Sequence, residues 1–269
     1  MVNSSQATHQ TTRAPIVYTS NGLQIFGVVH RPLEPASYLR PGVVLYHGFM
    51  ATKCQPPHRI FVQLAEASAQ LGMVSLRIDL PGRGDSEGES IDITVDGDLD
   101  AARSAINFLC AQPDVDAANI GLVGMSWGGT LAATLAGRDQ RVAGTVLWSS
   151  APGATPNWQP ELHDVGGRMA AEVVGNLVGE PFYASLHQLH PIEELKHTRS
   201  PVLLVYGTND EVVPSLEIAQ AERQLTAADI PNRVIRIEGA DHVFFRHEWQ
   251  QQVLQHTVAW LRQTLLPQR

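Results

Sequence analysis

Short apolar runs alternate along the chain with segments in which apolar residues recur every three to four positions. The runs indicate buried strands, and the segments between them indicate amphipathic helices. Strands separated by helices of this length usually pair in parallel and are covered on both faces, so the pattern predicts an α/β fold with a mostly parallel central sheet. The first strand is expected to be antiparallel. Expected strands are 23–30, 41–46, 73–78, 119–123, 142–148, 201–207 and 233–237, and expected helices are 58–71, 94–110 and 129–136.

Two regions depart from this alternation. Residues 1–14 are polar and are expected to form a flexible tail, which leaves 15–269 as a single α/β domain. The stretch at about 150–198 separates two expected strands and contains a helix-compatible part, 168–177. A connection of this length is usually functional, so we predict a small helical cap over the site, with a plain long connection as the alternative.

The sequence Gly124-Met125-Ser126-Trp127-Gly128 follows one apolar run and precedes a helix-forming segment. This is the G-x-S-x-G pattern in the strand-turn-helix context of a nucleophile elbow. Its glycines leave room for the strained turn that lifts the serine hydroxyl above the sheet. The following helix points its first N–H groups toward negative charge that develops there. The pattern predicts Ser126 as a catalytic nucleophile.

A serine hydroxyl is a weak nucleophile, so the elbow requires a base and a residue that orients this base. Asp210 follows the run 201–207, and His242 follows the run 233–237. Both stand after expected strands, where open α/β sheets build their sites. The chain order serine, acid, histidine is that of α/β-hydrolases. We predict a triad in which His242 accepts the proton of Ser126 and Asp210 orients His242.

Other residues compete for two of these roles. Glu211 could project from the same loop as Asp210, and the sequence favours Asp210 while leaving Glu211 open. Asp241 adjoins His242 but follows no strand of its own. His247 falls at the start of the expected last helix, which makes it a weaker candidate for the base.

A second turn supplies candidates for stabilising an oxyanion. The run 41–46 leads into His47-Gly48-Phe49-Met50. The glycine lets the backbone turn so that the N–H of Phe49 faces the nucleophile, and the N–H of Trp127 is the expected second donor. Such donors stabilise the carbonyl oxygen as it becomes negative. The side chain of His47 is expected to brace this turn.

These motifs, together with the loop Asp79-Leu80-Pro81-Gly82-Arg83-Gly84-Asp85-Ser86, resemble the α/β-hydrolase superfamily over most of the chain. Within it, the chain resembles small bacterial carboxylesterases of the feruloyl and cinnamoyl esterase type, which carry a similar His-Gly-Phe turn and a D-x-x-G-x-G-x-S loop. The resemblance implies the α/β-hydrolase fold and hydrolysis of carboxylic esters. Trp127 stands where many of those esterases carry glutamine, and its indole is expected to narrow or reshape the acyl pocket.

Composition narrows the class of protein. The chain has 269 residues, of which 43% are hydrophobic, and this suits one large core. Its net charge of −8 argues against nucleic acid as a partner, because phosphate binding needs clustered Lys and Arg. The sequence has neither an apolar stretch of the roughly 18 residues that span a bilayer nor the pattern of a signal peptide. The lone cysteines Cys54 and Cys110 suit a reducing compartment, so we expect a cytoplasmic protein without a membrane partner.

The expected substrate-binding residues come from the cap and from the turn after 41–46. Most have aromatic or flexible apolar side chains, which suit a concave pocket for uncharged acyl groups. They are His47, Met50, Trp158, Met169, Phe182 and Tyr183.

We therefore predict a serine hydrolase that cleaves a small-molecule carboxylic ester through an acyl-enzyme, with neither a cofactor nor a metal site. Thioester, amide or peptide hydrolysis by the same triad is the alternative, because these reactions pass through similar tetrahedral intermediates. A protein of this fold that only binds is a further alternative, against which the intact motifs argue. Dehalogenase or dienelactone hydrolase chemistry is not expected, because aspartate and cysteine are typical of those elbows. The sequence leaves open whether the protein forms a homo-oligomer.

Overall fold

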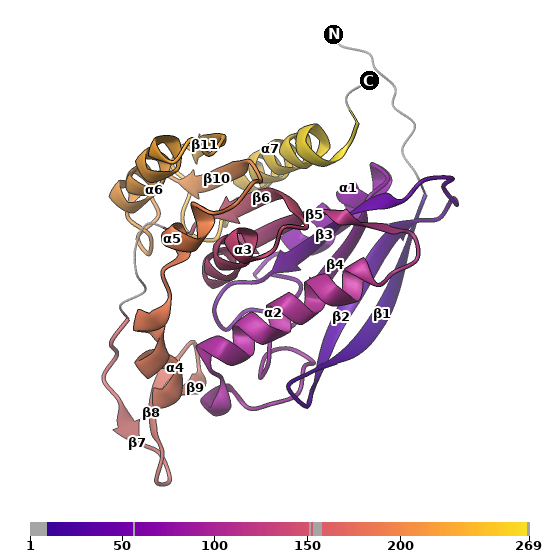
Figure 1. The fold of residues 1–269 in the computed structure, drawn as a ribbon. Helices are drawn as coiled ribbons and strands as arrows, with labels where there is room; N and C mark the ends of the chain where they lie inside the picture. The colour runs from indigo at the N-terminus through magenta and orange to yellow at the C-terminus, as the bar shows by residue number, and fades with distance from the viewer. Residues whose placement is uncertain (1–9, 56, 151, 153–157, 268–269) are drawn as a thin grey trace.

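The computed structural model describes residues 10–55, 57–150, 152 and 158–267. Its centre is a twisted eight-stranded sheet in the order β1-β2-β4-β3-β5-β6-β10-β11 (Figure 1). Strand β2 is antiparallel to both of its neighbours, whereas all pairs from β4 to β11 are parallel. The strands are β1 (Thr11–Ser20), β2 (Leu23–Pro32), β3 (Arg40–Tyr46), β4 (Val74–Ile78), β5 (Val115–Met125), β6 (Val142–Trp148), β10 (Val202–Gly207) and β11 (Asn232–Ile237).

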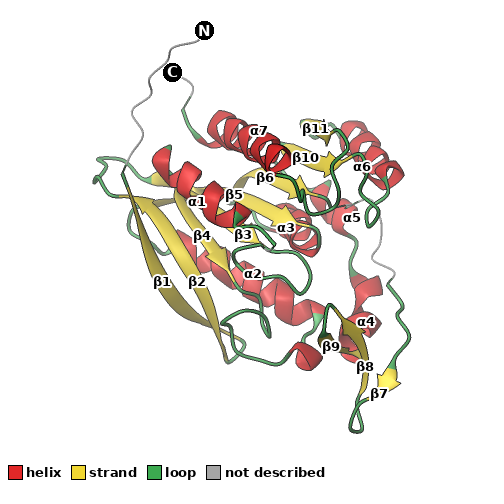
Figure 2. Cartoon of the chain, turned by 180° about the vertical axis from the view of Figure 1, so that it is seen from behind, coloured by secondary structure: helices red, strands yellow, loops and turns green. Residues whose placement is uncertain are grey.

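Helices cover both faces of this sheet. Figure 1 shows α2 and α3 in front of the sheet, and Figure 2 shows α1 and α7 on the opposite side. The helices α5 and α6 share the α3 side, where α5 packs between α3 and α6. The helices are α1 (Ile60–Gln70), α2 (Val95–Cys110), α3 (Trp127–Arg138), α4 (Glu180–Ser185), α5 (Pro191–Leu195), α6 (Ser215–Ala227) and α7 (His247–Leu265), with short 3-10 turns at Ser90–Asp92 and Leu186–Gln188.

The central strands are mostly apolar because both of their faces are covered. Every residue of β3 and of β10 is buried. The core has one cluster on each side of the sheet, the first including Leu99 and Leu131 and the second including Phe61 and Leu261. This confirms the predicted fold class, and it gives a rigid frame whose parallel strands end along one edge.

The chain joins the sheet earlier than the sequence pattern indicates. Strand β1 begins at Thr11, inside the stretch predicted as a tail, and pairs with β2 from the pair Thr11 and Pro32 onward. Most β1 side chains are exposed or half-buried because β1 is an edge strand, so its apolar signal is weak. Residues 1–9 of the predicted tail lie outside the described residues.

The predicted cap is mixed in structure. Strands β7 (His163–Asp164), β8 (Met169–Val173) and β9 (Asn176–Gly179) form a small antiparallel sheet, which α4 and α5 follow. The expectation of a helix at 168–177 is therefore wrong. Val174 and Gly175 have φ of +50° and +73°, the two-residue turn that favours a hairpin over a helix. Residues 151 and 153–157 of the predicted cap lie outside the described residues.

Candidate active site

Ser126 occupies a sharp turn between β5 and α3. Its backbone has φ of +51° and ψ of −116°, a combination that costs free energy for any residue with a side chain. The turn fits only because its neighbours are glycines. A Cβ on Gly128 would lie 2.0 Å from the carbonyl oxygen of Tyr46, and one on Gly124 would lie 2.1 Å from that of Gly128. The backbone N–H of Ser126 donates to the carbonyl of Trp148 at 2.8 Å, which ties the turn to β6.

The structure brings Ser126, His242 and Asp210 together at the carboxyl edge of the sheet. The Nε2 atom of His242 lies 3.1 Å from Oγ of Ser126, and its Nδ1 atom lies 2.9 and 3.0 Å from the carboxylate oxygens of Asp210. The Asp210 side chain is almost fully buried, and one of its oxygens also accepts the N–H groups of Val212 and Val213 at 2.9 Å. With its orientation fixed in this way, the carboxylate can hold His242 with Nε2 toward the serine.

The competing residues lie elsewhere. Glu211 and His247 are exposed. The Asp241 carboxylate accepts the N–H groups of Val243 and Phe245, at 3.1 and 3.0 Å, and so shapes the loop that carries the histidine. The carboxylate placed against His242 is therefore that of Asp210.

The turn after β3 lies against the elbow. A Cβ on Gly48 would be 3.6 Å from the Cβ of Ser126, and the N–H of Gly48 donates to the side-chain oxygen of Gln55 at 2.8 Å. Within the described part of the chain, the backbone N–H groups of Phe49 and Trp127 have no hydrogen-bond acceptor. Both N–H groups are thus free to donate a hydrogen bond.

The side chain of His47 is fully buried, which excludes it from the substrate surface where the sequence placed it. Its Nε2 accepts the N–H of Leu80 at 3.0 Å, so its Nδ1 carries the proton and donates to the carbonyl of Gly48 at 2.8 Å. Burial lowers the pKa of His47 to about 4, which keeps the ring neutral. His47 therefore ties the turn after β3 to the loop after β4.

Five aromatic side chains form a continuous cluster beside the elbow. Phe182, which is buried, has ring centroids 4.9 Å from Phe49 and 5.2 Å from Trp127. Trp158 lies 5.1 Å from Phe49 and 5.4 Å from Tyr183. Three of the five come from the predicted cap, so cap and elbow meet in one apolar wall.

Two other expected substrate-binding residues are placed differently. Met169, on β8, is 41% exposed. Met50 is half-buried with φ of +52° and packs against the core cluster on the α2 side. Substrate contact by Met169 and Met50 stays a prediction.

Sequence reasoning missed a buried ion pair next to Trp127. Asp98, in the first turn of α2, is fully buried, and its carboxylate accepts two bonds from Arg83 and one from the indole N–H of Trp127. Burial raises the pKa of the Asp98 carboxyl, whereas the bonds from Arg83 and Trp127 act in the opposite direction. An acid at this position is also typical of a helix N-terminus, so the sequence carried no distinct signal.

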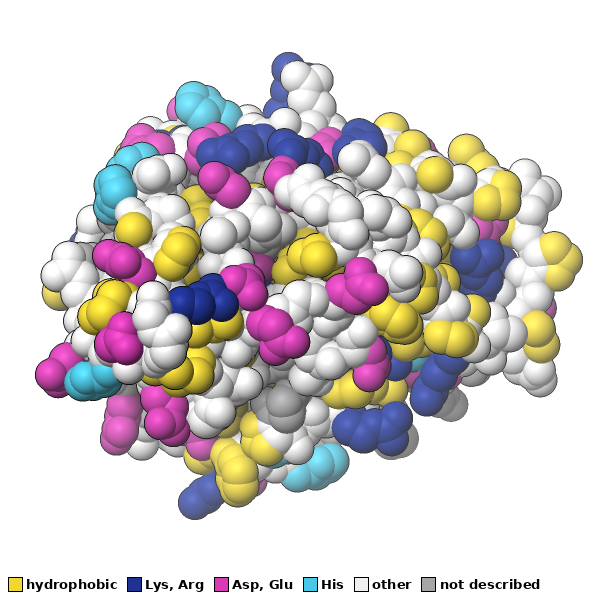
Figure 3. Space-filling model, turned by 90° about the horizontal axis from the view of Figure 1, so that it is seen from below, with side chains coloured by type: hydrophobic (Ala, Val, Ile, Leu, Met, Phe, Trp, Pro, Cys, Tyr) yellow, Lys and Arg dark blue, Asp and Glu magenta, His cyan; other side chains and the backbone are white. Residues whose placement is uncertain are grey.

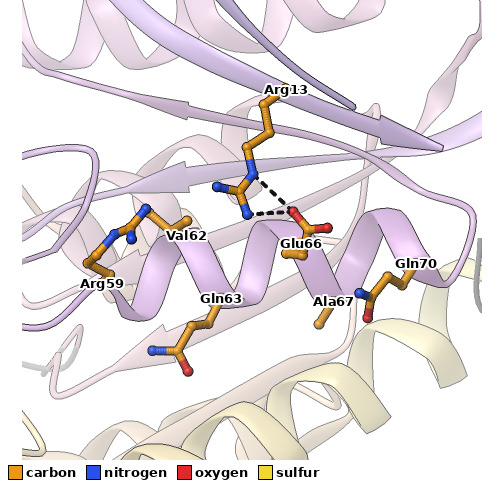
Figure 4. A pocket seen from close by; sticks show the side chains of 7 residues that line it. All are labelled: Arg13, Arg59, Val62, Gln63, Glu66, Ala67 and Gln70. Carbon is orange, nitrogen blue, oxygen red and sulfur yellow. Dashed lines mark hydrogen bonds and ion pairs between the residues drawn. The ribbon is translucent and has the colours of Figure 1, made fainter. Parts of the chain in front are cut away.

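A surface pocket of about 430 Å³ lies along α1 (Figure 4). Its walls include Arg13 and Glu66, which pair with each other, but none of the candidate site residues. In the part of the chain that is described, no group of three or more His, Cys, Asp or Glu side chains could hold a metal ion. Among the same residues, no helix is long and apolar enough to cross a membrane. On the face in Figure 3, basic side chains lie among acidic ones and do not form a continuous basic surface.

The fold and the elbow define an α/β-hydrolase, and residues 88–265 match the dienelactone hydrolase family. The chain belongs to this family, although its elbow carries Ser126. Two uncharacterized proteins of Mycobacterium tuberculosis strains are 30% identical to it over 181 residues, or 67% of this chain. The chain spans 57% of the length of these relatives. A polyketide transferase of Stachybotrys chlorohalonatus is 29% identical over 129 residues, which cover 48% of this chain and 41% of that one.

Solved structures share the fold. Est1E of Butyrivibrio proteoclasticus with bound ferulic acid superposes with a TM-score of 0.79 at 18% identity, covering 94% of this chain and all of that one. A dienelactone hydrolase of Anabaena variabilis superposes with a TM-score of 0.66 at 22% identity, covering 96% of this chain and all of that one.

Proposed function

We propose that this protein is a serine hydrolase that cleaves carboxylic esters of uncharged acyl groups through an acyl-enzyme. The observation that carries the proposal is the unbroken chain of contacts from Asp210 through His242 to Ser126, beside two unengaged backbone N–H groups. Family membership supports hydrolysis as the class of reaction. The identity of the nucleophile rests on the geometry of this chain alone.

The geometry suits general base catalysis. As Oγ of Ser126 attacks the ester carbonyl carbon, Nε2 of His242 accepts its proton, and Asp210 stabilises the imidazolium that forms. In this proposal the N–H groups of Phe49 and Trp127 bind the carbonyl oxygen as it becomes negative. His242 then protonates the departing alkoxide, which leaves an acyl-enzyme. A water molecule, deprotonated by the same nitrogen, releases the acid and restores the serine.

The walls of the site favour an uncharged acyl group. The aromatic cluster offers flat apolar surface, and the nearby cation Arg83 is already neutralised by Asp98. A carboxylate on the substrate would lose its hydration without gaining a charged partner. Esters with short to medium acyl chains are therefore the first choice of substrate. Hydroxycinnamoyl esters are the second choice, and the ferulic acid bound to Est1E agrees with an aromatic acyl group in this fold.

Transfer of the acyl group to an acceptor other than water is a second candidate function. One relative is named a polyketide transferase, and the same acyl-enzyme would serve an alcohol or thiol acceptor. Adding small alcohols to the ester assay separates the two reactions, because transfer gives a new ester and hydrolysis gives only the acid.

Labelling with a fluorophosphonate probe tests the proposal directly. Wild-type protein should gain one adduct that peptide mapping places on Ser126, and should hydrolyse p-nitrophenyl esters of short to medium acyl chains. Ser126→Ala should abolish the adduct and lower kcat by about 10³-fold or more. Ser104→Ala, which removes a hydroxyl on α2 that pairs with Ser20, is the matched control and should keep both. An adduct that persists in Ser126→Ala would show that the elbow is not the reactive site.

A further inference from the structure

Two turns beside the candidate oxyanion site are tied to one buried carboxylate on α2, that of Asp98. The Oδ1 atom of Asp98 lies 2.6 Å from Nη1 of Arg83, and its Oδ2 atom lies 3.0 Å from Nη2 of Arg83. The same Oδ2 atom accepts the indole N–H of Trp127 at 2.8 Å. Three donors thus hold a side chain that has no exposed surface.

Arg83 also links Asp98 to Phe49, the residue whose N–H is the other expected oxyanion donor. The guanidinium of Arg83 lies 5.6 Å from the ring centroid of Phe49, within cation–π distance, and also donates to the carbonyl of Pro81. Arg83 belongs to the loop after β4, Phe49 to the turn after β3 and Trp127 to the elbow after β5. Asp98 is therefore in contact, directly or through Arg83, with the side chains of Phe49 and Trp127, the two residues whose N–H groups are the expected oxyanion donors.

Stability alone gives little reason for this arrangement. A buried ion pair repays its desolvation only with good geometry, and apolar residues of similar volume often stabilise a core as well or better. What the carboxylate adds is orientation, because a hydrogen bond at the tip of the ring fixes both side-chain torsions of Trp127.

We propose that Asp98 is a positioning residue for ester hydrolysis, acting on Trp127 directly and on Phe49 through Arg83. This inference rests on the proposed function. By fixing the two side chains, Asp98 keeps the N–H groups of their backbones aimed at the oxygen that becomes negative. An error of about 1 Å in such groups costs on the order of 10²-fold in rate. The carboxylate contacts neither the serine nor the histidine and takes no part in proton transfer.

Two conservative variants test this role. Trp127→Phe keeps an aromatic ring against Phe182 but removes the donor to Asp98. Asp98→Asn keeps the size of the side chain but removes its charge. Each should lower kcat for a neutral p-nitrophenyl ester by about 10- to 100-fold with KM little changed, because the contact matters most in the transition state. Affinity for a trifluoromethyl ketone, which forms an oxyanion on the serine, should fall by a similar factor, and affinity for the product acid should not.

Non-additivity gives the sharper readout. Because both substitutions break one contact, the double variant should be little slower than the slower single variant. Asp139→Asn is the matched control, because Asp139 pairs with Arg141 at the opposite end of α3, and it should keep kcat at the wild-type value.

The results separate this inference from the proposed function. Wild-type kcat in Trp127→Phe, or a loss confined to KM, would overturn the positioning role even if Asp98→Asn failed to fold. An equal loss in Asp139→Asn would overturn it as well, because the effect would then be one of general stability. A wild-type protein that neither hydrolyses esters nor reacts with a fluorophosphonate would instead overturn the proposed function.

Discussion

The Nε2 atom of His242 lies 3.1 Å from Oγ of Ser126, although 116 positions separate the two residues in the chain. They meet because β5 and β11 run parallel and end at the same edge of the sheet. The serine is held by the glycines of the elbow, and the histidine by the loop that Asp241 shapes. Each side chain is positioned by its own strand end, so substitutions can test the contributions one at a time.

Asp210 and Glu211 are adjacent but differ in what they contact. We expect Asp210→Asn to lower kcat by about 10⁴-fold, because an amide can stabilise the wrong tautomer of His242. Glu211→Gln is the control and should stay within a few-fold of wild type, because its side chain is exposed. Steady-state kinetics on one p-nitrophenyl ester measures both. The reverse ranking would move the orienting role to Glu211.

The glycine at position 128 tests how far the elbow depends on close approach. Gly128→Ala would place a methyl group 2.0 Å from the carbonyl oxygen of Tyr46, so we expect the free energy of unfolding to fall by about 3 kcal/mol or more. Gly166→Ala is the control, since its Cβ would meet nothing within 4 Å and only its φ of +64° is strained. We expect that substitution to cost about 1–2 kcal/mol. Urea denaturation measures both, and equal losses would contradict the clash.

His30 predicts how stability depends on pH. Burial, with the charges of Arg77 and Arg13, lowers the pKa of His30 from 6.5 to about 4. Between these pH values the unfolded chain binds a proton at His30 that the folded chain does not. The contribution of His30 to the free energy of unfolding is therefore fully present above pH 6.5 and is lost as pH falls toward 4. From pH 7 to 5 this loss is about 2 kcal/mol for one such histidine.

His30→Gln separates this contribution from other titrations. Its side-chain oxygen can accept the bond that Nε of Arg77 donates to the histidine. Urea denaturation at pH 7 and pH 5 should show a smaller pH-dependent loss for His30→Gln than for wild type. His187→Gln, an exposed control, should behave as wild type. An unchanged pH dependence in His30→Gln would exclude His30 as its source.

Trp158 and Met169 have the same exposed fraction, 41%, but only Trp158 joins the aromatic cluster. Trp158→Ala should change the ranking of acyl chains on a p-nitrophenyl ester panel, with KM affected more than kcat, because a wall of the pocket is lost. Met169→Ala should leave the ranking unchanged. A panel in which the two variants shift selectivity equally would show that Trp158 does not line the acyl pocket.

The sequence predicted best where local pattern and tertiary contact agree. The elbow could be placed because Gly124 and Gly128 are required by the same close approaches that make the turn possible. Strands β10 and β11 could be placed because complete burial makes β10 apolar throughout and the turn after each carries polar residues. Asp210 and His242 followed from their positions after these strands.

Other features have no local signal. The ion pair of Asp98 and Arg83 joins residues 15 positions apart, and each alone looks like an ordinary loop or helix-end residue. The edge strand β1 is stabilised by pairing with β2, which no apolar period reveals. The hairpin of β8 and β9 also lacks a clear signal, because its alanines and valines fit the period of a helix as well as that of a strand, and the turn at Val174 and Gly175 decides between them.

The aromatic wall comes largely from one contiguous insertion between β6 and β10, whereas the serine, acid and histidine stand in the turns that follow strands of the central sheet. Acyl-group recognition and catalysis therefore depend on different stretches of the chain. Replacing the insertion with that of a relative would change the acyl pocket and leave the three catalytic residues in place. Phe182 is the position that any graft must match, because its ring contacts both Phe49 and Trp127. A donor segment lacking an aromatic residue there would remove the ring that the inserted segment packs against Trp127.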